Sequence, residues 1–484
     1  MRNQWFPTIA FAFVSTMPFA FAQTIDAFNP LPGGSPKALA IQPDGKILIG
    51  SSFQSVAGTT LRGAARIDTD GSVDDSFGDP AANGDVVAIA VQADGKVLVG
   101  GDFDQIGGAA RHYLARLNAN GSLDASFSDP ALDSEVWSIA VQPDGKVLAA
   151  GGFQNIGGTA QKYLARFNSN GTLDTSFANP QLCCLDARAV ALQADGHVVV
   201  GGYFSQAGSA SSGYLARYSS SGVFDATFPA TPASSAVTAL LVGPDGSVYT
   251  NGGYSTSDQS NLRLVAKLSS SGALVGTFDD LHTDGEANSF VLQPNGKMLI
   301  GGNFQQVGGQ PRHALARLNA DGSLDATFKD LAFSLDATHP DGSIFGIAAQ
   351  TDGNVLAVGN FSLVGTQSRQ YMARAVTGDP ATNRFTGQPS GSNVVAIWTR
   401  GGVGPELARA PTLMHSTDGM NFTAVGPMTR IATGWQATAP YNVHGALFYL
   451  EAIGTTSGGA QNGSSGRVAS DIYFSDTIFA DGFE

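Results

Sequence analysis

The 484-residue sequence contains few cysteines and few charged residues. Its two cysteines, Cys183 and Cys184, are adjacent, which excludes a framework of several disulfides. Their spacing fits no zinc motif, since zinc ligands in such motifs are separated by two or more residues and need further partners. The pair could form a vicinal disulfide, a bond between chains or two free thiols, and we favour free thiols. Stability must therefore come from packing.

Charged residues make up 14% of the chain, against roughly 25% in an average soluble protein. They comprise 26 basic and 40 acidic side chains, which gives a formal net charge of −14. This balance argues against nucleic-acid binding, because phosphate contacts need clustered Lys and Arg. Beyond the N-terminus, no stretch approaches the ~20 apolar residues that span a bilayer, so we expect no transmembrane anchor.

The N-terminus has the features of an export signal. Residues 1–22 carry Arg2, an apolar stretch and the ending Ala20-Phe21-Ala22, whose small residues suit signal peptidase. We therefore expect cleavage after Ala22 and a protein that is secreted or held at the cell surface, with the periplasm as an alternative.

Glycine is abundant, at 61 residues, and much of it belongs to a unit that occurs seven times. In each copy, an Asp-Gly or Asn-Gly turn is followed by an aromatic residue after eight positions, a cation after thirteen more, and Phe after a further eleven. The turn glycines are Gly45, Gly95, Gly145, Gly196, Gly246, Gly296 and Gly353, and the closing phenylalanines are Phe77, Phe127, Phe177, Phe228, Phe278, Phe328 and Phe385. All variation in length falls between that Phe and the next turn glycine.

Each copy reads as short antiparallel strands. In Val86–Gly101, apolar runs flank an Asp-Gly pair, which favours a type I′ hairpin. Tyr113–Asn118 and Ser122–Phe127 would supply a third and a fourth strand. Four strands in about 50 residues, repeated radially, are typical of a propeller blade. The sequence therefore predicts an all-β fold, a β-propeller of about seven four-stranded blades.

The same residues carry a family resemblance. The block DGK-[IV]-L-[IV]-G-G-x-F, joined to LAR-x-N-x-[ND]-G-[ST]-L-D-x-[ST]-F, resembles the delta-60 repeat family of exported bacterial β-propellers, over about Ile25 to Phe385. The resemblance implies a propeller fold; it implies neither an enzymatic activity nor a ligand. Copy five departs most, with Lys267 in place of Arg and Val275 in place of Asp.

The ends of the repeat region suggest how the ring closes. Thr24–Pro32 resembles the end of a repeat, so we expect it to share a blade with the last copy and leave no open edge. We divide the chain into a leader at 1–22, propeller repeats at 23–390, a β-rich segment at 391–474 and a short tail at 475–484. The β-rich segment would form either a small sandwich or a degenerate eighth blade, beginning at Val394–Ile397.

The search for reactive groups yields no committed site. Asp68, Asp70 and Asp74 surround a Gly turn and could hold Ca²⁺, but we favour the turn itself as the reason for them. Only His112 and His313, among seven histidines, share a repeat position. We therefore predict no catalytic, cofactor-binding or metal-binding residues. The recurring cation and Asp, as in Arg116–Asp124 and Arg317–Asp325, should form ion pairs within each blade.

We expect a monomeric, non-catalytic propeller that binds an extracellular or envelope protein or glycan, or serves as a scaffold. A propeller-based hydrolase or lyase acting on polysaccharide or ester is the alternative. The contact surface should lie on the rim of the variable loops, in particular Pro180–Arg188, Ala230–Val237 and Lys329–Ser343. Off-pattern aromatics are candidates for stacking on sugars: Trp137, Trp398, Trp435, Tyr371 and Tyr441.

Overall fold

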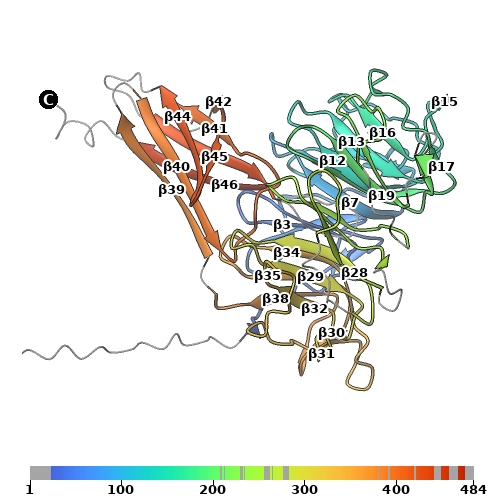
Figure 1. Cartoon of the computed structure of the whole chain (residues 1–484), viewed down its shortest axis with the longest axis vertical. Coiled ribbons are helices and arrows are strands. Elements are labelled where there is room, and N and C mark those ends of the chain that lie inside the picture. Colours follow the sequence, from blue (N-terminus) through green and yellow to red (C-terminus); the bar gives the residue numbers. More distant parts are fainter. Residues whose placement is uncertain are drawn as a thin grey trace, which may run out of the picture.

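The structure is a computed structural model, and it describes residues 23–207, 210–211, 213–228, 233, 235–255, 262–263, 265–275, 283–379, 381–390, 393–418, 421–440, 448–456 and 467–474. All regular elements in these ranges are β-strands. They form a propeller followed by a β-sandwich (Figure 1). Within the described residues, no helical segment has the length and apolar character needed to cross a membrane. The leader and the C-terminal tail lie outside the described residues.

Seven antiparallel sheets make up the propeller, one for each repeat. Blades 1 to 4 are β2 (Ala38–Ile41), β3 (Ile47–Gly50) and β6 (Ala64–Ile67); β7 (Asp85–Val91), β8 (Val97–Asp102) and β11 (Leu114–Leu117); β12 (Val136–Val141), β13 (Val147–Gly151) and β16 (Leu164–Phe167); and β18 (Ala187–Leu192), β19 (Val198–Gly202) and β22 (Leu215–Tyr218). Blades 5 to 7 are β23 (Leu240–Val242), β24 (Val248–Thr250) and β27 (Ala266–Leu268); β28 (Ala287–Leu292), β29 (Met298–Gly302) and β32 (Leu315–Leu318); and β34 (Ser343–Ala349), β35 (Val355–Asn360) and β38 (Met372–Val376).

Short ribbons project from the blades. They are β4 (Ser55–Val56) with β5 (Thr59–Thr60), β9 (Gln105–Ile106) with β10 (Ala109–Ala110), β14 (Asn155–Ile156) with β15 (Thr159–Ala160), β17 (Leu182–Cys183) with β20 (Gln206–Ala207) and β21 (Ala210–Ser211), β25 (Tyr254–Ser255) with β26 (Leu262–Arg263), β30 (Gln306–Val307) with β31 (Gln310–Pro311), and β33 (Phe333–Ser334) with β36 (Leu363–Val364) and β37 (Gln367–Ser368). The outermost strand of blades 1 to 6 is very short and pairs through a single bridge, such as Leu117 with Leu123.

The ring closes as the sequence predicts. β1 (Thr24–Ile25) pairs with β38 of blade 7, with Ile25 opposite Ala375. Asp26 then accepts a 2.6 Å hydrogen bond from Arg374 Nε, and the Arg374 guanidinium lies 4.7 Å from the centroid of the Phe28 ring. Residues 24–28 thus supply the outer strand, the carboxylate and the aromatic ring of the seventh blade.

The turns between the first two strands of each blade are three-residue loops. In blade 2, Gly95 N donates to Gln92 O and Gln92 N donates to Lys96 O, and Gly95 has φ +79° whereas Asp94 does not have positive φ. This is a type I turn followed by a left-handed glycine. The type I′ prediction is wrong, because it would need positive φ at both central residues.

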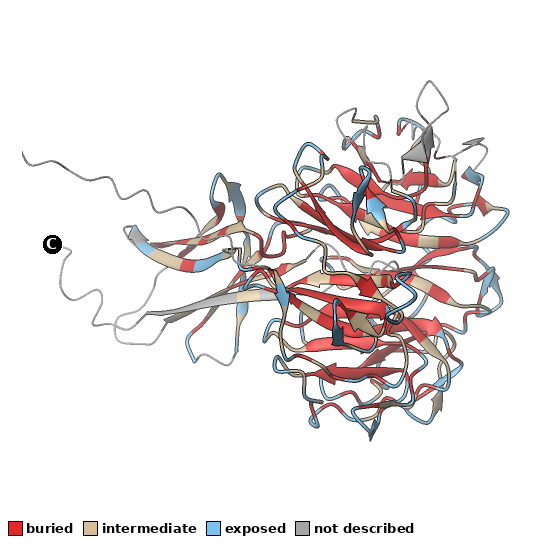
Figure 2. Cartoon of the chain, turned by 90° about the horizontal axis from the view of Figure 1, so that it is seen from below, coloured by how far each residue is buried: buried red, intermediate tan, exposed pale blue. Residues whose placement is uncertain are grey.

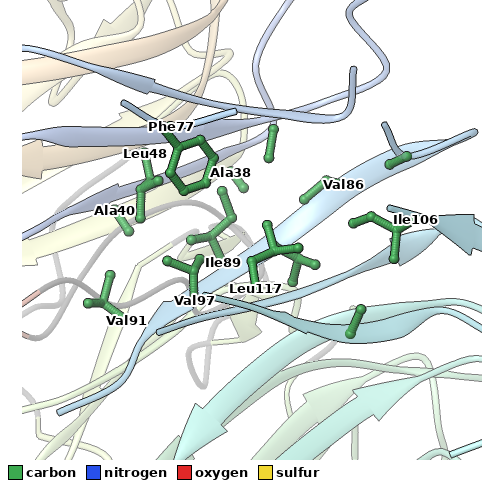
Figure 3. Packing of buried hydrophobic residues seen from close by; sticks show 14 of the residues in the cluster. Ala38, Ala40, Leu48, Phe77, Val86, Ile89, Val91, Val97, Ile106 and Leu117 are labelled. Atoms are coloured by element: carbon green, nitrogen blue, oxygen red, sulfur yellow. The ribbon is translucent and has the colours of Figure 1, made fainter. Parts of the chain in front are cut away.

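The first strand of each blade lies innermost, and neighbouring first strands contact one another around the axis. Most residues of the blade strands are buried (Figure 2), and buried apolar side chains of adjacent blades pack together in clusters. Between blades 1 and 2, Ala38 and Leu48 meet Val86, Ile89 and further residues of the second blade (Figure 3). The near-continuous apolar runs of the sequence reflect this burial on both faces of each sheet.

The predicted ion pairs are present, within larger clusters. Arg116 Nε lies 2.7 Å from Asp124 Oδ2, and both side chains are buried. Lys96 Nζ contacts the same oxygen at 2.8 Å, and Arg116 Nη1 donates to Ser169 O of the next blade at 2.6 Å. Equivalent Arg–Asp pairs are Arg66–Asp74, Arg166–Asp174, Arg217–Asp225 and Arg317–Asp325. The cluster therefore ties both the outer part of a blade and neighbouring blades together.

Paired glycines lie where sheets approach closely. A Cβ at Gly100 would come within 2.8 Å of the Val136 side chain in the next blade, and one at Gly101 within 1.9 Å of Asp85 O. Neither position leaves room for a side chain: Gly100 packs against the next blade, and Gly101 against the neighbouring strand of its own blade.

The C-terminal segment is a sandwich of two four-stranded antiparallel sheets. One consists of β39 (Ala381–Ser390), β40 (Asn393–Gly402), β44 (Gly434–Pro440) and β43 (Thr429–Ile431), and the other of β42 (Thr423–Pro427), β41 (Thr412–Ser416), β45 (Phe448–Thr455) and β46 (Arg467–Phe474). Of the two sequence alternatives, the sandwich is the one that forms. The first strand of the sandwich begins at Ala381. The predicted boundary at residue 390 therefore assigns a whole strand of the sandwich to the propeller.

This strand also corrects the assignment of Phe385. The repeat spacing placed Phe385 in blade 7, but it is buried in the sandwich core with Trp398 and Trp435. Val394–Ile397 lies in β40 and starts no eighth blade. The prediction that Phe385 belongs to blade 7 is wrong: Phe385 has the spacing of the repeat by coincidence, and Phe28 supplies the aromatic ring of blade 7.

The sandwich covers part of the turn end of the propeller. Gln293 Nε2 donates to Val403 O at 2.7 Å, Glu406 N donates to Leu292 O at 3.0 Å, and Arg409 Nη1 donates to Val141 O at 3.1 Å. The opposite end of the axis, where the first strands begin, is away from these contacts.

Candidate binding site

A β-bulge near the start of the innermost strand builds the candidate site. In β12, the register shifts between Val136 and Ser138, and in β18 between Ala187 and Ala189. The same shift occurs in β7, β28 and β34. A bulge turns its extra residue out of the regular pleat. The bulged residues stand eight positions before the turn glycine.

This repeat position carries a different residue in every blade. The seven residues are Lys37, Val87, Trp137, Arg188, Thr238, Asn288 and Phe345. All but Asn288, together with Tyr203, line a cavity of about 270 Å³. Because six blades contribute to it, the cavity lies on the propeller axis, at the end opposite the turns. We call these lining residues the axial mouth.

Carboxylates two positions earlier in the repeat hold the charged groups of the mouth. Lys37 Nζ lies 2.7 Å from Asp85 Oδ2, and Arg188 Nη2 lies 2.6 Å from Asp186 Oδ2. In blade 3, Glu135 occupies this position and accepts a 3.2 Å hydrogen bond from Trp137 Nε1. The side chains of the mouth are thus oriented before any ligand arrives.

An aromatic stack occupies one side of the mouth. The Arg188 guanidinium lies 4.1 Å from the centroid of the Trp137 ring and 5.3 Å from that of Tyr203. Tyr203 is 43% exposed, unusual for a large apolar side chain in this structure. Cation–π contact of this kind fixes both partners and leaves ring surface for a ligand.

Carboxylates next to the mouth outnumber the two cations that line it. The position two before the mouth residue is acidic in four blades, at Asp85, Glu135, Asp186 and Glu286, whereas the mouth itself has only Lys37 and Arg188 as cations. Burial raises the pKa of nearby Tyr113, and the carboxylates of Asp102, Asp104, Glu135 and Asp133 raise it further. A negative field therefore extends from the mouth over blades 2 and 3.

The carboxylates considered as calcium ligands already accept hydrogen bonds from neighbouring groups. Asp74 Oδ2 accepts from Arg66 Nε at 2.5 Å and from Lys46 Nζ at 2.7 Å, and its Oδ1 accepts from Ser76 Oγ at 2.6 Å. Asp70 accepts from Ser72 N and Oγ. Over the described ranges, no three or more His, Cys, Asp or Glu side chains are grouped to hold a metal ion.

The remaining candidates lie away from the mouth. His112 and His313 pair with Asp129 and Asp330 on the outer loops, at 2.6 and 2.5 Å. Trp398 and Trp435 are buried in the sandwich, so they cannot stack on a ligand. Tyr371 is not off-pattern: like Tyr113, it occupies a left-handed position eighteen residues after the turn glycine. Tyr441 lies outside the described residues. Only Trp137, of the aromatics singled out, lines the mouth.

The cysteines are not free thiols, contrary to the favoured interpretation. Cys183 and Cys184 form a disulfide with each other, in the loop that leads to Arg188.

The three variable loops lead directly to the mouth. Pro180–Arg188 ends on a mouth residue, residues 230–237 immediately precede Thr238, and Lys329–Ser343 ends two residues before Phe345. Sequence reasoning named these loops but missed the mouth position itself. It could have been found by comparing the seven copies at each offset from the turn glycine, since this strand position differs in all seven.

Comparisons with known proteins agree on the repeat. Five segments match a family model described as "Domain of unknown function (DUF5122) beta-propeller": residues 42–77, 92–127, 142–177, 193–228 and 293–328. Copies five and seven, which depart from the repeat pattern, are not among these segments. No curated protein matches the chain significantly.

Several solved structures are similar at low identity. AztD from Citrobacter koseri is 10% identical, covering 84% of this chain and 98% of its own, with a TM-score of 0.27. A structure titled "Glycoside hydrolase" is 12% identical, covering 91% of this chain and 99% of its own, with a TM-score of 0.27. The polysaccharide lyase Uly1 is 12% identical, covering 80% of this chain and 88% of its own, with a TM-score of 0.21. The chain therefore contains repeats that match a β-propeller repeat family of unknown function.

Proposed function

We propose that this chain is a non-catalytic binding propeller whose axial mouth takes the end of a neutral or amino-bearing glycan. One observation carries the proposal: the repeat position with seven different residues is the position that lines the axial cavity. Where blades pack against each other, the same repeat position needs similar residues in every copy. A position whose side chain differs in all seven copies is not constrained in this way, so its residues can be selected for contact with a ligand.

The chemistry of the mouth supports a sugar as ligand. Ring faces such as those of Trp137 and Tyr203 bury the C–H faces of a pyranose, while carboxylates such as Glu135 and Asp186 accept hydrogen bonds from hydroxyl or ammonium groups. The excess of carboxylates disfavours uronic acids and sulfated glycans and favours neutral sugars or amino sugars.

The engagement of the carboxylates beside the mouth supports binding without turnover, because glycoside hydrolysis needs two carboxyl groups that can act on the glycosidic bond. In the part of the chain that the structure describes, the mouth residues include no Ser, Cys or His nucleophile, and each cation is paired with a carboxylate. A protein ligand that presents a Lys or Arg side chain is the competing occupant.

Calorimetric titration of residues 23–484 with four oligosaccharides of equal length tests the proposal: a neutral glucan, an N-acetylglucosamine oligomer, its deacetylated form and a uronate oligomer. We expect binding of one of the first three, with no binding of the uronate. Trp137→Ala should weaken it roughly thirtyfold, which equals about 2 kcal/mol, the loss typical of an aromatic anchor.

Val223→Ala is the matched control, since Val223 is an exposed apolar residue (57%) on an outer hairpin. Uronate binding that survives Trp137→Ala, or a glycan affinity that Trp137→Ala leaves unchanged, would refute the proposed site. Release of new reducing ends during incubation with a bound glycan would favour the hydrolase alternative.

The proposal includes export, since such glycans lie outside the cytoplasm. Residues 1–22 would be removed, leaving Gln23 as the first residue. Mass spectrometry of the protein recovered from culture fluid or periplasm should show a chain that begins at Gln23, whereas an intact Met1 segment would argue against it.

A further inference from the structure

Polar side chains hold three of the loops that lead to the axial mouth. In each of three blades, the residue twelve positions before the turn glycine accepts hydrogen bonds from two consecutive backbone N–H groups of the neighbouring ribbon. The acceptors, which we call polar clamps, are Asn83, Asp133 and Asp284. In blade 3, Asp133 Oδ1 lies 2.8 Å from Gln154 N and 3.1 Å from Asn155 N.

Blade 4 has a disulfide at the position where blades 2, 3 and 6 have a polar clamp. Twelve positions before Gly196 stands Cys184, which has φ +92° and is bonded to Cys183. The loop is one residue longer here, as the 51-residue spacing from Gly145 to Gly196 shows. In blade 4, β17 places Cys183 opposite Gln206 of β20. This is the ribbon that corresponds to the one bound by the polar clamps in blades 2, 3 and 6.

The residues that follow the disulfide belong to the mouth region. Asp186 O accepts a 2.9 Å hydrogen bond from Tyr203 N, and the Asp186 carboxylate holds Arg188 against Trp137. Leu185 is 59% exposed. At its repeat position, the other copies have only glycine or serine: Gly34, Gly84, Ser134, Ser235, Gly285 and Gly342.

We propose that the Cys183–Cys184 disulfide is a positioning element for the axial mouth, and that its reduction weakens ligand binding there. The disulfide closes a small ring that includes the Cys183–Cys184 peptide bond, so it restricts the backbone that leads into Leu185, Asp186 and Arg188. This inference rests on the proposed function of the mouth.

Reduction removes that restriction. A dithiol donates two electrons and two protons, the S–S bond breaks, two thiols form, and the dithiol becomes its own disulfide. Without a polar clamp, the loop is then held by the short β17–β20 pairing and the hydrogen bond from Tyr203 N to Asp186 O. If the reduced loop holds the binding geometry about a tenth of the time, the apparent affinity falls about tenfold.

The experiment compares oxidised and dithiothreitol-treated protein, residues 23–484, titrated with the glycan that binds best. We expect reduction to weaken binding about tenfold, and Cys183→Ser/Cys184→Ser to bind as weakly as the reduced protein whether or not dithiothreitol is present. Asp133→Ala, which removes the clamp of blade 3 and keeps both cysteines, is the matched control: dithiothreitol should weaken its binding by the same factor as in the wild type.

Hydrogen exchange supplies a readout that needs no ligand. Reduction should speed exchange at the Tyr203 amide, whose acceptor is Asp186 O, and leave the clamped loop at residues 129–135 unchanged. Equal affinity and equal Tyr203 exchange in the oxidised and reduced proteins would overturn the positioning role. If Trp137→Ala leaves binding unchanged, the proposed function fails instead, so the two failures are distinguishable.

Discussion

Removal of Arg116 tests whether the buried ion-pair clusters hold the blades together. The Arg116 and Asp124 side chains are only 9% and 7% exposed, and their closest atoms are 2.7 Å apart. Loss of one partner of a buried pair costs about 3–5 kcal/mol, because the other charge stays buried. Here Lys96 still contacts Asp124 at 2.8 Å, so we expect the lower figure, about 3 kcal/mol, for Arg116→Ala.

The expected shift in melting temperature follows from the size of the propeller. Unfolding entropy is about 2.1 cal/mol/K per residue, so the roughly 350 residues between Gln23 and Val376 have about 0.7 kcal/mol/K. A loss of 3 kcal/mol then lowers the Tm by about 4 °C, provided that the propeller unfolds as one unit.

Calorimetry of the four proteins in a double-mutant cycle, with Arg116→Ala and Asp124→Ala, measures the coupling energy. We expect at least ~1 kcal/mol. The control is the pair Arg62–Asp79, whose side chains are 45% and 23% exposed, and whose coupling should not exceed about 0.5 kcal/mol after screening by solvent. Equal coupling in the two cycles would show that burial does not decide the strength of these pairs.

Three further predictions concern the same framework. Phe28→Ala should destabilise the propeller by about 3–5 kcal/mol, measured by urea unfolding, because Phe28 is 1% exposed and completes the last blade. Although burial alone would raise the pKa of Asp124, hydrogen bonds from Lys96, Ser126 and Arg116 hold that pKa well below the ordinary value. The stabilising contribution of Asp124 is therefore complete above about pH 4 and is lost as the pH falls through the folded pKa. The difference in unfolding free energy between wild type and Asp124→Asn should accordingly shrink in acid. Gly100→Ala should lower the Tm, since its Cβ would lie 2.8 Å from the Val136 side chain, and an unchanged Tm would show that the blades can separate without cost.

Local patterns in the sequence predicted the repeated part of the fold. The seven copies carry the blade strands, the ring closure through Thr24–Ile25 and the Arg116–Asp124 pairing, because each depends on spacing that the chain repeats. The same reliance on spacing caused the error at Phe385. Its offset fits a blade, but the Phe28 ring already occupies the matching place in blade 7.

The axial mouth depends on contacts between blades, which no single copy contains. Trp137 and Arg188 are 51 residues apart, and the packing of blade 3 against blade 4 brings the guanidinium to 4.1 Å from the indole ring. Likewise, the sequence shows that Cys183 and Cys184 are adjacent, but the tertiary structure shows that they replace a polar clamp in the loop before the mouth. The sequence by itself thus determined the blade, since a hairpin and its apolar faces are set by neighbouring residues. The tertiary structure decided the site, since strands that are distant in the chain must meet around the axis before the residues at this variable position can line a cavity.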